Sequence, residues 1–167
     1  GSNIFPYIKK NLDDIITVED DELIVAFLDM VENHKMIVEN SGLLTVAALK
    51  HLGVKDKRVV SILSGGNMDV ITMSSVVQQG LIFRDRIFTV SVLLPDKPGE
   101  LARVAGVIAE QKGNVIKLEH NQFVSINRNA EVELRITLET FGMEHKEKIV
   151  EELEKAGYKP KVVRTNL

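Results

Sequence analysis

The clearest pattern of hydrophobic and polar positions lies in the second half of the chain. Between residues 131 and 139, apolar side chains alternate with charged or polar ones, which is typical of a strand with one buried face. Apolar residues at helical spacing predict two amphipathic helices in the same region. The predicted elements are a strand over 87–94, a helix over 99–112, strands over 115–123 and 131–139, a helix over 144–156 and a strand over 159–163. This βαββαβ order is the ferredoxin-like arrangement, and Asn127-Arg128-Asn129 supplies its polar hairpin connection.

The first half of the chain has helical patterns but few strands. The predicted elements are a helix over 3–12, a strand over 14–18, a helix opened by the acidic run 19–22, a short apolar segment over 36–38, a helix over 42–52 capped by Ser41, a strand over 58–63, and a helix over 68–79 ended by Gly80. Two strands cannot bury their own faces. We therefore expect a segment of a larger α/β sheet whose other strands lie upstream, rather than a small free-standing α/β domain.

Composition and charge support two modules. The 167 residues are 44% hydrophobic and 27% charged, with a net charge of −3. Up to residue 83 there are 7 Lys and Arg against 11 Asp and Glu, and beyond it 14 against 13, so the halves carry −4 and +1. We place the module boundary between residues 83 and 84.

Several function classes are disfavoured by the same composition. The chain lacks the basic charge of a nucleic-acid-binding protein, and it has no apolar run of the roughly 20 residues that a membrane span needs. Zero Cys excludes disulfides and thiolate metal sites and agrees with a cytoplasmic location. Because the four His are scattered, we expect no metal site.

A glycine-containing tetrapeptide follows the apolar run 59–63. It reads Ser64-Gly65-Gly66-Asn67, and glycines there allow a sharp turn and a close approach of the backbone. Alone, such a tetrapeptide is simply a good turn.

In order along the chain, residues 13–18, 38–42 and 60–67 resemble the last part of the catalytic domain of fold-type II pyridoxal-phosphate enzymes, the threonine ammonia-lyases (threonine dehydratases) and related serine dehydratases. The resemblance implies that Ser64 hydrogen-bonds the pyridine nitrogen of pyridoxal phosphate, with Gly65, Gly66 and Asn67 beside the ring. A hydroxyl partner leaves the ring a moderate electron sink, which favours β-elimination. The Schiff-base lysine and glycine-rich phosphate loop of that family do not occur here. We therefore expect no catalytic residue in this chain, no activity from it alone, and the cofactor in the parent enzyme only.

The second motif is Asp96-Lys97-Pro98-Gly99-Glu100-Leu101, between the predicted strand 87–94 and helix 99–112. It resembles the strand-to-helix turn of ACT domains, which are amino-acid-sensing modules, and the resemblance covers residues 84–167. The alternative is that Pro-Gly makes only a tight turn. A helix N-terminus suits a carboxylate, and a glycine there leaves room for a ligand. The positions implied for effector binding are Asp96, Pro98, Gly99, Glu100, Leu101, Asn114 and Val115.

These resemblances indicate a fragment of a threonine ammonia-lyase, which converts L-threonine to 2-oxobutanoate and ammonia, carrying the ACT domain that regulates it. The apolar residues Leu94, Leu101 and Val115 favour isoleucine or valine as effector. We expect a homo-oligomer formed through the ACT domains. The alternative function is a stand-alone amino-acid-binding regulatory protein without catalysis.

Overall fold

The computed structural model describes residues 2–121 and 131–166. The chain divides into two compact units, Gly1–Val77 and Gln78–Leu167. The division falls inside the helix α4 (Val70–Phe83), whereas the sequence places the boundary after residue 83.

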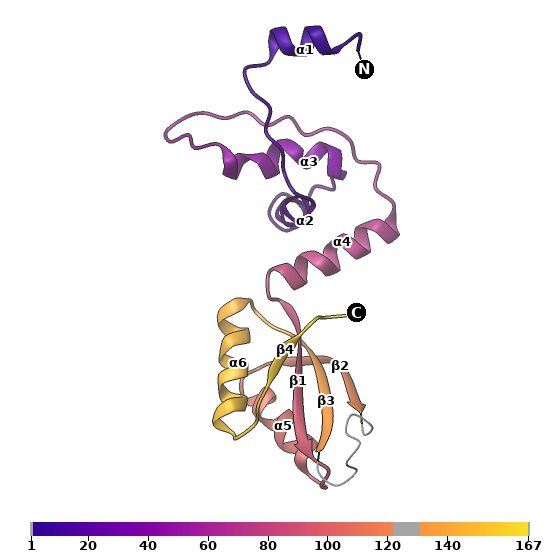
Figure 1. Cartoon of the computed structure of the whole chain (residues 1–167), viewed down its shortest axis with the longest axis vertical. Coiled ribbons are helices and arrows are strands. Elements are labelled where there is room, and N and C mark those ends of the chain that lie inside the picture. The colour runs from indigo at the N-terminus through magenta and orange to yellow at the C-terminus, as the bar shows by residue number, and fades with distance from the viewer. Residues whose placement is uncertain (1, 122–130, 167) are drawn as a thin grey trace. The chain divides into compact units, whose positions relative to one another are not determined.

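The second unit has the predicted βαββαβ order (Figure 1). Its elements are β1 (Ile87–Pro95), α5 (Glu100–Glu110), β2 (Asn114–Asn121), β3 (Glu131–Glu139), α6 (Met143–Lys155) and β4 (Lys161–Val163). The four strands form one antiparallel sheet in the order β2-β3-β1-β4. The ferredoxin-like fold is therefore confirmed. The end of the predicted strand 115–123 and the hairpin residues 127–129 lie outside the described residues.

The core of this unit lies between α5, α6 and one face of the sheet. Its fully buried side chains include Val90, Leu134 and Ile136 from the strands and Ile108 and Ile149 from the helices. The alternating pattern over 131–139 is confirmed, because its apolar positions are the ones that face this core.

The opposite face of the sheet is polar but partly closed by its own side chains. Thr89 and Thr137, neighbours in the β1–β3 register, share a hydrogen bond of 2.9 Å, and the Ser91 hydroxyl donates to the Glu133 carboxylate at 2.6 Å. All four residues are buried. The hydrogen bond from Ser91 and the nearby Arg135 guanidinium lower the pKa of Glu133, against the opposing effect of burial.

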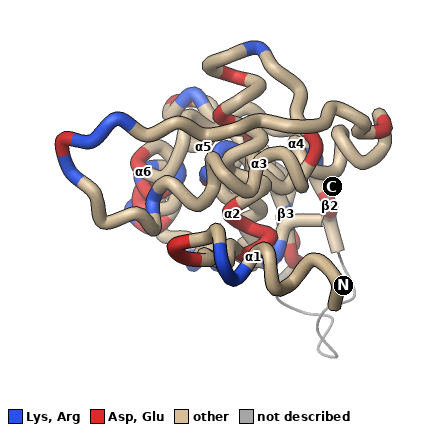
Figure 2. Tube along the Cα trace, turned by 90° about the horizontal axis from the view of Figure 1, so that it is seen from above, with Lys and Arg blue, Asp and Glu red and all other residues tan. Residues whose placement is uncertain are grey.

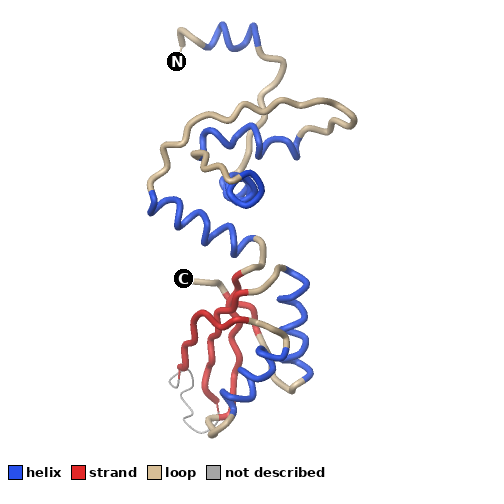
Figure 3. Tube along the Cα trace, turned by 180° about the vertical axis from the view of Figure 1, so that it is seen from behind, coloured by secondary structure: helices blue, strands red, loops and turns tan. Residues whose placement is uncertain are grey.

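The first unit contains helices and loops but, among its described residues, no strand (Figure 3). Its elements are α1 (Phe5–Asn11), α2 (Asp20–Asp29), the π-helical turn η1 (Met30–His34), α3 (Asn40–Ala47), the 3₁₀ turn η2 (Ala48–His51) and the start of α4. The predicted strands over 14–18 and 58–63 are wrong. Ile15 is 69% exposed and Val60 is 88% exposed, since no neighbouring strand is present to accept their backbone hydrogen bonds and cover their side chains.

Two predicted helix ends are also wrong. Glu39 rather than Ser41 is the residue before the first turn of α3, and the Ser41 hydroxyl instead donates to the Glu39 carboxylate at 2.7 Å. The helix α4 passes through Gly80 to Phe83, and the Gly80 carbonyl accepts the Arg84 N–H at 3.1 Å. A single glycine inside a helix is tolerated when apolar residues on both sides continue the pattern.

The helices of the first unit enclose a small core of their own. Phe27 and Leu43 are fully buried, and Met73, Val76 and Val77 of α4 pack against the same cluster. Basic and acidic residues are distributed along the trace (Figure 2). In the part of the chain that the structure describes, every helix is too short or too polar to cross a bilayer.

Candidate functional site

The structure brings Ser64-Gly65-Gly66-Asn67 next to the start of α3. The Glu39 N–H donates to the Gly65 carbonyl at 3.3 Å. Gly65 has φ +78°, and a Cβ atom at this position would lie 2.3 Å from Glu39 Oε1. The positive φ therefore favours glycine at 65, whereas the flexible Glu39 side chain could move away from a Cβ atom. Gly66 differs from the expectation, because it has no positive φ and a Cβ there would lie 3.5 Å from its nearest neighbour.

The extended segment before this turn lies against α3. The Thr45 hydroxyl donates to the Ile62 carbonyl at 2.9 Å, and a Cβ atom on Gly42 would lie 1.7 Å from the Ser64 carbonyl oxygen. Gly42 therefore allows α3 and the turn to approach closely. The Ser64 side chain is exposed, and its hydroxyl makes no hydrogen bond with any residue that the structure describes. It is available to an external partner such as a ring nitrogen.

A cleft of about 320 Å³ opens beside this turn. It is lined by Glu39, Asn40, Ser41, Asn67, Met68, Asp69 and Thr72. Hydrogen bonds from the Thr72 hydroxyl and from the backbone N–H groups of Thr72 and Ile71 lower the pKa of Asp69. The cleft thus presents two carboxylates and no Lys or Arg, which disfavours a phosphate group. Ser64 does not line this cleft, so the residues present offer pyridoxal phosphate an exposed hydroxyl beside the cleft and no basic group for its phosphate.

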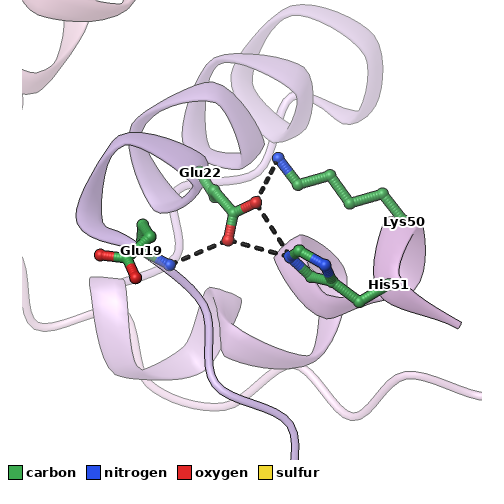
Figure 4. A network of polar contacts seen from close by, with 4 residues as sticks. All are labelled: Glu19, Glu22, Lys50 and His51. Atoms are coloured by element: carbon green, nitrogen blue, oxygen red, sulfur yellow. Dashed lines mark hydrogen bonds and ion pairs between the residues drawn. The ribbon is translucent and has the colours of Figure 1, made fainter.

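Sequence reasoning missed a polar network at the start of α2 (Figure 4). The Glu22 carboxylate accepts the Glu19 N–H at 2.9 Å, contacts Lys50 Nζ at 2.6 Å and contacts His51 Nε2 at 2.9 Å. Hydrogen bonds from Lys50, from the Glu19 backbone and from His51 lower the pKa of Glu22 to about 2. The Glu19–Glu22 spacing is that of a capping box, which could have indicated the helix start but not the contact with η2.

The predicted effector residues fall at two places in the second unit. At the β1–α5 turn, Gly99 precedes the helix with φ +95°, and no atom lies within 4 Å of where its Cβ would be. The turn is therefore open to solvent at Gly99. Glu100 differs, because its carboxylate already accepts the Tyr158 hydroxyl at 3.2 Å and contacts Arg103 at 3.1 Å. Burial and the Glu100 carboxylate raise the pKa of Tyr158.

Asn114 and Val115 lie at the other end of the sheet. Asn114 pairs with Glu139, which pairs in turn with Ile87 at the start of β1, whereas the turn follows Pro95 at its end. At about 3.3 Å per residue, the nine residues of β1 separate the two places by roughly 25 Å. One copy of the chain therefore does not bring the predicted effector residues together. The Asn114 side-chain N–H donates to Glu139 at 3.1 Å, and its side-chain carbonyl oxygen accepts no hydrogen bond from the residues that the structure describes.

Apolar side chains are exposed near both places. Leu101 is 44% exposed on α5, and Val115 and Leu118 are 40% and 42% exposed on the edge strand β2. Among the described residues, no group of three or more His, Asp or Glu side chains is placed to hold a metal ion.

Comparison with known proteins agrees with the fold of the second unit. Residues 88–157 match the ACT domain family. An L-threonine ammonia-lyase of Geobacter sulfurreducens is 38% identical over 95% of this chain and 40% of that protein, and one of Thermotoga maritima is 32% identical over 98% of this chain and 41% of that protein. The L-threonine dehydratase biosynthetic IlvA of Pasteurella multocida is 28% identical over 95% of this chain and 30% of that protein. The chain spans about two fifths or less of these relatives. It contains an ACT domain and is similar, over nearly its whole length, to part of the L-threonine ammonia-lyases.

Proposed function

We propose that this chain is a fragment of a pyridoxal-phosphate-dependent threonine ammonia-lyase of the cytoplasm, which deaminates L-threonine to 2-oxobutanoate, and that it carries the ACT domain that regulates the enzyme. The observation that supports this most strongly is the ACT fold of residues 88–157 within a chain that is similar over 95% of its length to such an enzyme. Because the relatives are named as enzymes, they favour the hypothesis that this chain is part of an enzyme over the alternative that it is a stand-alone amino-acid-binding regulatory protein.

The first unit supports the same proposal through the surfaces it leaves uncovered. Val60 and Ile62 are 88% and 73% exposed in an extended segment, and Ile15 is 69% exposed in another. Apolar extended segments of this kind are stabilised when neighbouring strands cover them. We propose that the remainder of the catalytic domain supplies these strands and also the lysine and the phosphate-binding loop.

In that assembled enzyme, the Ser64 hydroxyl would donate to the pyridine nitrogen, with Gly65, Gly66 and Asn67 beside the ring. The cofactor supplies the electron sink for elimination of the substrate hydroxyl group. The positive φ of Gly65 and the close approach of Gly42 to the Ser64 carbonyl set the position of the Ser64 backbone. The chain alone is expected to be inactive.

We propose that two copies of the ACT domain form the effector site together. Asp96, Pro98, Gly99 and Leu101 of one copy would then face Asn114 and Val115 of the other, because one copy holds these groups about 25 Å apart. The free backbone N–H groups at the start of α5 suit the effector carboxylate, and the Asn114 carbonyl oxygen suits its ammonium. The exposed Leu101 and Val115 favour a branched side chain, so we propose isoleucine or valine as effector. Glu100 would act indirectly, by holding Tyr158.

A chimera tests the enzyme assignment. This chain replaces the matching two fifths of the Thermotoga maritima enzyme, and threonine deamination is measured with and without isoleucine. We expect a deaminating enzyme whose response to isoleucine and valine follows this chain. A second chimera ends after residue 83 of this chain and so has no ACT domain. We expect it to deaminate threonine without responding to either amino acid. A folded first chimera that does not deaminate threonine would refute the proposal.

Calorimetry and sedimentation test the effector site separately on the chain as it is. We expect isoleucine to bind a dimer or larger oligomer, and Asn114→Ala to weaken that binding. The matched control is Asn11→Ala, in the first unit, which should leave binding unchanged. A monomer at tens of micromolar, with and without isoleucine, would count against a site shared by two copies.

A further inference from the structure

A second cleft, of about 400 Å³, lies in the second unit at the edge of the sheet formed by β4. It is lined by Gln79, Ile82, Phe83, Asp85, Ile87, Phe88, Lys146, Val162, Val163, Arg164 and Thr165. The sheet order β2-β3-β1-β4 puts it at the edge opposite to Asn114, and the β1–α5 turn lies at the far end of β1. It is therefore separate from the proposed effector site. Its volume falls within the range of about 300–1,000 Å³ that is usual for small-molecule sites.

The polar end of the cleft is preformed. Lys146 Nζ lies 2.6 Å from Asp85 Oδ1 and 5.8 Å from the centre of the Phe88 ring. The two charged side chains are only 22% and 19% exposed. The Thr140 hydroxyl donates to the Asp85 carbonyl, and the Thr140 N–H donates to the Arg86 carbonyl at 2.8 Å, which fixes the turn that carries Asp85. A ligand would thus meet a wall that is already ordered.

The charge of the lining selects an anion. Asp85 is neutralised by Lys146, whereas the Arg164 guanidinium makes no ion pair with any residue that the structure describes. Arginine presents a fork of N–H donors that matches a carboxylate. With Asp85 already paired, the lining has no free carboxylate for a ligand ammonium group.

Apart from Gln79 and Thr165, the rest of the lining is apolar. Phe83 is 46% exposed and Val162 is 50% exposed, with Ile82 and Val163 partly buried beside them. Together with the free guanidinium, these side chains define a ligand that has one acidic group and a compact hydrocarbon body. We propose that this cleft binds a small monocarboxylate with a branched or aromatic body, its carboxylate against Arg164 and its apolar part against Phe83 and Val162.

The proposal distinguishes 3-methylbutanoate from valine, which differs from it only by an α-ammonium group. The full chain, labelled at Ile and Val methyl groups, is titrated with each compound and followed by NMR. We expect 3-methylbutanoate to shift the methyl signals of Ile82, Val162 and Val163. We expect valine to bind the cleft with an affinity that is lower by about tenfold or more. Desolvating an unpaired ammonium group in an apolar cleft is unfavourable.

Two variants test the site itself. Arg164→Gln removes a charge-assisted hydrogen bond and should weaken the binding of 3-methylbutanoate about tenfold or more. The control Arg58→Gln changes an exposed arginine in the first unit and should leave this binding unchanged. Thr165→Trp should block the cleft and abolish the shifts without unfolding the chain, since residue 165 follows the last strand.

The proposal is overturned if 3-methylbutanoate leaves those methyl signals unmoved. It is also overturned if both variants leave the shifts intact, or if valine binds the cleft as well as 3-methylbutanoate does. Signals at Val115 that move with valine would report on the proposed effector site instead, so the two proposals can fail independently.

Discussion

The contact between Gly42 and Ser64 gives a prediction whose sign is opposite to the ordinary effect of the same substitution. Gly→Ala within a helix normally stabilises a protein by about 0.8–1 kcal/mol. At position 42, however, the new Cβ would lie 1.7 Å from the Ser64 carbonyl oxygen and 2.8 Å from a Val38 methyl group. Because the oxygen belongs to the backbone, α3 and the turn at 64–67 must separate.

Forcing an extra carbon into such a contact costs about 1–3 kcal/mol. For a unit of this size, a loss of 1 kcal/mol lowers the midpoint of thermal unfolding by about 4–8 °C. We therefore expect Gly42→Ala to lower the midpoint for the first unit by at least about 4 °C. Gly106→Ala is the matched control, since Gly106 also lies in a helix, α5, with no atom within 4 Å of its Cβ position. It should stabilise the second unit.

Hydrogen exchange with mass spectrometry separates the two units, since peptides from each report its unfolding. Gly42→Ala should also speed exchange at the Glu39 N–H, which donates to Gly65, because the turn moves away from α3. A variant as stable as the wild type, with unchanged exchange at Glu39, would show that Gly42 and Ser64 are not in contact and would refute the reasoning.

Three further predictions concern charge and packing. The pKa of Glu22 is lowered from 4.5 to about 2 in the folded chain, so the stabilisation that its carboxylate provides is fully present above pH 4.5 and is lost as the pH falls toward 2. Between these pH values, the midpoint of thermal unfolding should fall less for Glu22→Gln than for the wild type or for the exposed control Asp13→Asn. Leu134→Ala should destabilise the second unit by about 2–5 kcal/mol in urea titrations, because Leu134 is fully buried, and a loss below about 1 kcal/mol would contradict its place in the core. Ser91→Ala should raise the pKa of Glu133 in a carboxyl NMR titration, because it removes the hydrogen bond that contributes most to the lowered value; an unchanged pKa would rule that bond out.

The second unit could be predicted from sequence nearly in full. Its strands alternate polar and apolar residues, and its helices carry apolar residues at helical spacing, so local pattern and tertiary contacts agree. β3 begins and ends at the predicted residues, Glu131 and Glu139. The match of residues 88–157 to the ACT domain family confirms the resemblance that rested on the turn before α5.

The first unit shows the limit of local pattern. The helices α1 and α2 form as predicted, since a helix makes its backbone hydrogen bonds within its own segment. The strands over 14–18 and 58–63 do not form, because a strand makes its backbone hydrogen bonds with neighbouring strands and not within its own segment.

For the candidate sites, the sequence alone determined the residue types: a hydroxyl and glycines at 64–67, and an open glycine turn at 96–101. Only the tertiary structure decided which of them meet. It placed Gly65 against Glu39 across 26 positions of sequence, and it placed Gly99 and Asn114 at opposite ends of one sheet although they are 15 positions apart. The physical reason is that the number of residues in a strand or helix sets the length of that element. The direction in which the element runs through the fold is set by the packing of its apolar face against the rest of the chain.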